Sequence, residues 1–98
     1  MEKLNCELIK RNIYRLIIKN KNENITDIIS DFCKDLINSN KIESFSINNK
    51  IKENSNGDIV YNPNKLLLQN GNIYTIDLSN IEEKIKSFKL EKIIKKYE

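Results

Sequence analysis

Side chains that could perform acid–base or nucleophilic chemistry are few in this sequence. The chain contains no His, so a nucleophilic Ser or Cys would lack its usual base near neutral pH. Two carboxylate pairs remain, Asp31 with Asp35 and Glu82 with Glu83. Both pairs fall on segments with helical periodicity, where charged side chains form the solvated face. We therefore expect no enzymatic activity and no catalytic residue.

The cysteines and glycines do not form a binding motif either. Cys6 and Cys33 lie far apart without Cys-x-x-Cys spacing, so we expect buried free thiols rather than a metal or redox site. Gly57 and Gly71 fall in predicted turns, which leaves no glycine-rich loop for a phosphate. The sequence thus predicts no metal, no cofactor and no small-molecule ligand.

Length and charge set the limits on organisation and partners. A chain of 98 residues is long enough for one domain over residues 1–98 with one modest core. The net charge is +3, with basic residues concentrated at the two ends and aspartates in the middle, so an acidic partner is allowed but not required. No apolar run is long enough to cross a bilayer and the N-terminus lacks a secretory pattern, so we expect a cytoplasmic protein with no membrane contact.

Two N-terminal segments show the apolar spacing of amphipathic helices. In residues 3–19 the apolar side chains that share one stripe are Cys6, Ile9, Ile13, Leu16 and Ile17. Residues 25–37 repeat apolar positions at intervals of three and four, and Asn24 is suited to cap this helix, with Asp27 in its first turn. The sequence therefore predicts a helical pair at the start of the domain.

The last segment, residues 78–97, predicts a third helix that changes its apolar face. Ser79 and Glu82 have the spacing of a capping box. The first half of the helix then places Ile81, Ile85 and Phe88 on one side, whereas the second half places Leu90, Ile93, Ile94 and Tyr97 nearly opposite. We expect the first group to face the core and the second group to form a homodimer contact.

Residues 64–79 predict a β-hairpin. Asn70-Gly71 suits a two-residue type I′ turn. That turn would pair Leu68 with Ile73 and Leu67 with Tyr74, so that Leu66, Leu68 and Ile73 share one face. Such a hairpin is apolar on both faces and needs cover on both, from its own domain or from a second chain.

Residues 41–57 are compatible with two structures. As a strand they place Phe45, Ile47 and Ile51 on one face, and as a short helix they place Ile47 and Ile51 inward. In either structure Asn48, Lys50 and Lys52 face outward. The fold class is α+β in both cases, but only the helical alternative gives a third core helix.

With that helix, the order of elements resembles the winged helix-turn-helix family, a three-helix core followed by a β-hairpin wing, with a C-terminal dimerisation helix here. Within this family, the small dimeric accessory proteins of Gram-positive plasmid relaxosomes bind the origin of transfer chiefly through the wing. The chain resembles them in its length, AT-rich coding bias, polar hairpin tip and face-switching last helix. The resemblance implies a homodimer that binds double-stranded DNA.

The resemblance also assigns residues. The segment "SINNKIKENS" matches the recognition helix, and "NKLLLQNGNIY" matches the wing. Amide side chains can bond adenine and lysines can reach guanine or phosphate. The implied DNA-binding residues are Ser46, Asn48, Asn49, Lys50, Lys52, Lys65, Gln69, Asn70 and Asn72.

Two functions of different classes follow. The first is sequence-specific DNA binding as a homodimer, by a conjugation accessory factor or a small transcriptional regulator. The alternative is a protein-interaction module, such as a phage inhibitor or an antitoxin, without DNA binding. The two are separated by residues 43–53: a strand there gives an α-α-β-β-β-α domain with a small antiparallel sheet and removes the recognition helix.

Overall fold

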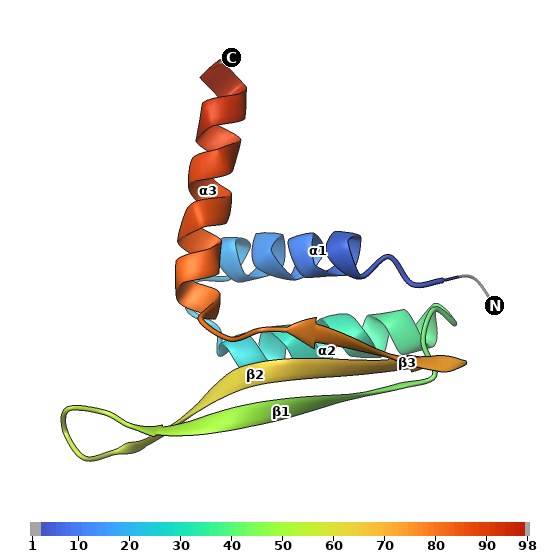
Figure 1. Ribbon diagram of the computed structural model, residues 1–98, viewed down its shortest axis with the longest axis horizontal. Coiled ribbons are helices and arrows are strands. Elements are labelled where there is room, and N and C mark those ends of the chain that lie inside the picture. The colour runs from blue at the N-terminus through green and yellow to red at the C-terminus, as the bar shows by residue number, and fades with distance from the viewer. Residues whose placement is uncertain (1–2, 98) are drawn as a thin grey trace.

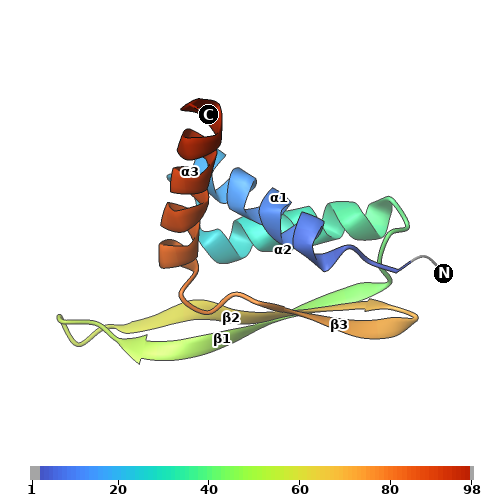
Figure 2. The same ribbon diagram turned by 45° about the horizontal axis from the view of Figure 1, so that its top comes forward.

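The computed structural model describes the backbone of residues 3–97 and the side chains of residues 3–91. The elements are α1 (Cys6–Lys19), α2 (Ile25–Asn38), β1 (Ser44–Glu53), β2 (Ile59–Asn70), β3 (Asn72–Asp77) and α3 (Ile81–Tyr97). The strands form an antiparallel sheet in the order β1-β2-β3, and α1 and α2 cover one of its faces (Figures 1 and 2). The α+β class and the α-α-β-β-β-α arrangement are confirmed.

Both N-terminal helices begin at Asn residues that cap them. The Asn24 side-chain oxygen accepts hydrogen bonds from the amides of Thr26 at 2.9 Å and Asp27 at 3.3 Å, as the sequence predicts for this helix. Asn5 caps α1 in the same way through the amide of Leu8 at 3.1 Å. The buried side chains of the two helices follow the predicted stripes, with Tyr14 added, and are Ile9, Ile13, Tyr14, Ile17, Ile28, Ile29 and Cys33.

Residues 44–53 form a strand, which decides between the two alternatives for this segment. In β1, Phe45 lies opposite Leu68 and Ile47 lies opposite Leu66, so the apolar residues of β1 pack beside the centre of β2. The recognition helix implied by the resemblance is therefore not formed. The segment becomes a strand because pairing with β2 half-buries Phe45 and Ile47 against the core, a long-range gain that local sequence does not reveal.

The hairpin formed by β2 and β3 has a register one residue away from the predicted one. Leu68 pairs with Tyr74 and Leu66 with Ile76, because the turn is centred on Gly71, whose φ is 76°. A one-residue slip moves every side chain of a strand to the other face. Tyr74 and Ile76 therefore face the helices, whereas Ile73 is exposed. The predicted grouping of Ile73 with Leu66 and Leu68 is wrong, since the observed register buries Ile76 instead.

Helix α3 rises away from the sheet (Figure 1). It begins at Ile81 rather than at residue 78, because the Ser79 hydroxyl donates to the Asp77 carboxylate at 2.6 Å instead of capping the helix. Ile81, Ile85 and Phe88 are buried, as predicted for the first half. The Phe88 ring meets Tyr14 edge-on at a centroid distance of 5.7 Å, which fixes α3 against α1.

Candidate functional site

The hairpin of β1 and β2 extends past the helices as an arm, which we define as residues 49–62 (Figures 1 and 2). Its turn is organised by Asn54, whose side-chain oxygen accepts from the amides of Asn56 at 3.0 Å and Asp58 at 2.9 Å. Gly57 completes the turn with a φ of 83°, a conformation that Gly adopts without steric cost. The turn therefore closes the arm as a hydrogen-bonded two-stranded ribbon.

A bulge marks the point where the arm leaves the domain. Asn48 pairs with Lys65, but the next pair is Asn49 with Pro63, so Asn64 is an extra residue in β2. Bulges of this kind bend a strand pair and increase its twist. Pro63 is buried, whereas every residue from Asn48 to Asn62 is exposed. Past the bulge the side chains of the hairpin are therefore not buried in the core.

One face of the arm is apolar and open to solvent. Ile51 lies directly opposite Tyr61. Ile59 lies opposite Glu53 in the next pair that shares this face, two residues further along each strand. The exposed fractions are 63% for Ile51, 62% for Tyr61 and 65% for Ile59. Clustered apolar side chains on an exposed surface mark interaction sites, whereas single exposed ones are ordinary.

The other face of the arm is polar and carries Lys50 opposite Asn62 and Lys52 opposite Val60. Both lysines line a hollow of about 330 Å³, whose opposite wall contains Glu82 and Glu83 from the first turn of α3. None of the ion pairs among the described residues joins these glutamates to the lysines, so the lysines keep their charge for a ligand beside β1, whereas the glutamates would repel an anion placed inside the hollow. A phosphate in this hollow would therefore meet little net positive charge, although lysine ligands alone would favour it.

The structure separates the predicted DNA-binding residues into groups. Ser46, Asn48, Lys65 and Gln69 share the face of the sheet that faces away from the helices, since their pairs alternate with the buried pairs of the core. The remaining five lie elsewhere. The arm contains Lys50, Lys52 and Asn49, and Asn49 is on the opposite face from the two lysines. Asn70 and Asn72 lie at the other end of the sheet, beside the turn between β2 and β3.

The outer sheet face is polar around a small apolar centre. The Ser44 hydroxyl donates to the Gln69 side-chain oxygen at 3.2 Å. Leu67 and the exposed Ile73 lie beside this pair and line a shallow hollow of about 220 Å³. Neither α1 nor α2 covers this face (Figure 2), so the second apolar face expected of the hairpin is reduced to these two side chains.

The residues predicted to form a homodimer contact lie in the outer half of α3. Leu90 is 60% exposed, whereas Phe88 two positions earlier is buried. Ile93, Ile94 and Tyr97 belong to the same helix, but their side chains lie outside the described residues.

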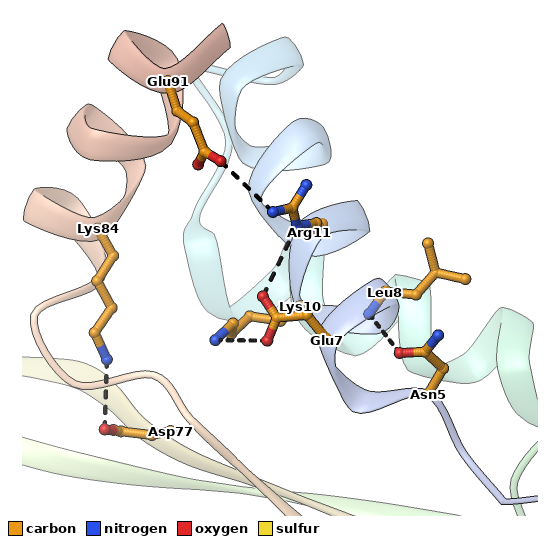
Figure 3. A network of polar contacts seen from close by, with 8 residues as sticks. All are labelled: Asn5, Glu7, Leu8, Lys10, Arg11, Asp77, Lys84 and Glu91. Atoms are coloured by element: carbon orange, nitrogen blue, oxygen red, sulfur yellow. Dashed lines mark hydrogen bonds and ion pairs between the residues drawn. The ribbon is translucent and has the colours of Figure 1, made fainter. Parts of the chain in front are cut away.

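Polar contacts join α3 to α1 and to the end of β3 (Figure 3). Arg11 is shared between Glu91 of α3 at 3.7 Å and Glu7 of its own helix at 3.8 Å. Lys84 of α3 contacts the Asp77 carboxylate at the end of β3, at 3.4 Å. Exposed ion pairs of this type contribute little stability individually, so the network serves mainly to orient the helix.

Two ionisable groups have pKa values set by this structure. The hydroxyl and amide of Ser79 both donate to Asp77 and, with Lys84, lower the pKa of that carboxyl to about 2. Burial raises the pKa of the Cys33 thiol to about 12. Cys33 is therefore a buried free thiol, as expected, whereas Cys6 is only half-buried.

Sequence reasoning missed the apolar face of the arm. The run Ile59-Val60-Tyr61 has high β-propensity and follows a turn at Asn54–Asp58, which could have indicated the outer strand of a long hairpin.

In the part of the chain that the structure describes, no helix has the length and apolarity that a bilayer crossing requires. No family model matches the sequence, and comparisons with curated proteins and with solved structures return no match.

Proposed function

We propose that this chain is a protein-interaction module and that the arm is its contact element. The observation that carries the proposal is the exposed apolar row of Ile51, Tyr61 and Ile59 on a paired two-stranded ribbon. Exposed apolar side chains on one face of a protruding hairpin have no role in the core of this chain. Burial against a partner protein gives them one.

The magnitude of this burial indicates what the arm can supply. Full burial of a large apolar side chain is favourable by about 1.5–3 kcal/mol, and roughly two-thirds of each of these three side chains is still exposed. Covering all three would therefore gain on the order of 4 kcal/mol. Association costs a comparable amount in lost translational and rotational freedom, so a stable complex needs further contacts beside this row.

The proposal is tested by identifying and then titrating the partner. Proteins retained by the immobilised chain would be identified by mass spectrometry, purified, and titrated by calorimetry with the wild type and with Ile51→Ser. Because the substitution removes the apolar contact of Ile51, we expect the dissociation constant of the partner for this variant to rise about tenfold.

Ile73→Ser is the matched control, since Ile73 is similarly exposed but lies in β3, on the outer sheet face at the end of the sheet away from the arm. The control should bind with wild-type affinity. Equal effects of the two substitutions, or no effect of Ile51→Ser, would contradict the assignment of the arm.

Binding of double-stranded DNA is the second candidate. The observation that favours it is the set of hydrogen-bonding side chains on the outer sheet face, with Asn48 and Lys65 paired across the strands, because a two-stranded ribbon can enter the major groove. The expected homodimer, through Leu90 and the outer part of α3, belongs to this proposal and is compatible with the first. Anisotropy titration with AT-rich duplexes tests it: saturable, salt-sensitive binding that differs between duplexes would support DNA recognition.

A further inference from the structure

The outer edge of the arm offers unpaired backbone groups. The Asn54 amide donates to the Asp58 carbonyl at 2.9 Å, which closes the hairpin with a bonded pair. In an antiparallel ladder, opposed pairs alternate between bonded and non-bonded. Glu53, Ile51 and Asn49 lie one, three and five positions before Asn54 and are therefore non-bonded positions. Their backbone amides and carbonyls point away from β2. Opposite Asn49 stands Pro63, whose lack of an amide hydrogen is compatible with a non-bonded pair.

This edge is open because β1 is the first strand of the sheet order β1-β2-β3. Its side chains alternate along the edge, with Lys50 and Lys52 on one face and Ile51 on the other, between Asn49 and Glu53. None of the carboxylates in the described residues forms an ion pair with either lysine. The edge thus combines a backbone template with two lysines on one face and the apolar side chain of Ile51 on the other.

We propose that the β1 edge of the arm binds an extended segment of a partner protein in which acidic and apolar residues alternate. The segment would add a strand beside β1, with its acidic residues next to Lys50 and Lys52 and its apolar residues next to Ile51. This inference rests on the proposed protein-interaction function and specifies the chemistry of the partner. Backbone hydrogen bonds supply affinity in this mode of recognition and alternate side chains supply specificity.

Charge disfavours a second copy of the same arm as the occupant. If two copies of β1 pair antiparallel with Ile51 opposite Ile51, Lys50 of one copy lies opposite Lys52 of the other. A shift by two residues in either direction places Lys50 opposite Lys50 or Lys52 opposite Lys52. Like charges directly opposite one another are destabilising. An acidic strand reverses the sign of this interaction, which is why the partner segment is assigned as acidic.

The test uses two fluorescein-labelled peptides of equal length, one alternating Glu with Val and one alternating Lys with Val. Fluorescence anisotropy should show binding of the Glu–Val peptide and weaker binding of the Lys–Val peptide. The double substitution Lys50→Glu with Lys52→Glu should weaken the Glu–Val peptide about tenfold and strengthen the Lys–Val peptide. Unchanged peptide preference after this charge reversal would overturn the proposal.

The backbone contribution is tested at Asn49. Asn49→Pro removes an outward amide without removing a bond to β2, and should weaken Glu–Val peptide binding, whereas Asn49→Ala keeps the amide and should bind as the wild type does. Chemical-shift dispersion in a ¹H–¹⁵N spectrum establishes that Asn49→Pro is folded. If the folded Asn49→Pro variant binds the peptide normally, edge pairing is wrong.

The same variants separate this inference from the proposed function. If the natural partner loses affinity for Ile51→Ser but not for Asn49→Pro or the charge-reversed variant, the arm contacts a protein through its apolar face and the edge-pairing inference fails alone. If the partner binds all of these variants equally, the proposed function of the arm fails as well.

Discussion

Two substitutions in the same hairpin should have very different effects on stability. Leu66 in β2 is fully buried and lies between Ile47 of β1 and Ile76 of β3. Leu66→Ala leaves a cavity in a packed site and should lower the free energy of unfolding by about 3 kcal/mol. Ile51 is 63% exposed, so only about a third of its burial gain of roughly 1.5–3 kcal/mol is present. Ile51→Ala should therefore cost at most about 1 kcal/mol, which is an upper bound because unfolded chains are partly compact.

Thermal unfolding followed by far-ultraviolet circular dichroism measures both effects. For a domain of this size, about 1 kcal/mol corresponds to roughly 4–8 °C in Tm. Leu66→Ala should lower Tm by more than about 10 °C and Ile51→Ala by less than about 8 °C. If Ile51→Ala were as destabilising as Leu66→Ala, the arm would be packed against the core, and the argument that its apolar face is available to a partner would be refuted.

Three further predictions concern ionisation, thiol reactivity and assembly. Asp77 has a folded pKa of about 2 against an ordinary 3.8, so its contribution to stability is complete above pH 3.8 and is lost as pH falls toward 2. Between these pH values the free energy of unfolding, measured in urea, should therefore decline less steeply for Asp77→Asn than for the wild type. Identical slopes would contradict the contact with Ser79. Burial and the raised pKa of Cys33 predict that a thiol reagent modifies native protein at Cys6 first and reaches Cys33 only on unfolding, so simultaneous modification in mass spectra would argue against the buried position. A homodimer through the outer part of α3 predicts a dimer in sedimentation velocity that Leu90→Glu converts to monomer; a monomeric wild type would exclude this contact.

Local signals in the sequence predicted the helices well. The cap at Asn24 and the apolar repeat of α2 are interactions within a few residues, so they are readable from the sequence and are confirmed. The start of α3 shows the limit of such signals. The Ser79 hydroxyl had the spacing of a cap, but it bonds Asp77 at the end of β3, and a contact with the preceding strand is not part of the helix pattern.

The sheet depended on choices that only the assembled core makes. Asn70-Gly71 suggested a two-residue turn, yet the register centred on Gly71 buries Ile76 beside Leu66 and leaves Ile73 outside. Residues 44–53 suited both a helix and a strand, and pairing with β2 decided the outcome. The candidate site followed from that decision, since the strand removes the recognition helix and creates the arm.

The position of the arm's partner can be tested directly by photocrosslinking in the source cells. A benzophenone amino acid at position 61 would report what lies against the apolar face, and the same group at position 35, exposed on α2, is the control. We predict a discrete adduct from position 61 that resists nuclease, is digested by protease and is absent from position 35. An adduct that collapses on nuclease treatment, or identical adducts from both positions, would contradict the assignment of the arm as a protein-binding element.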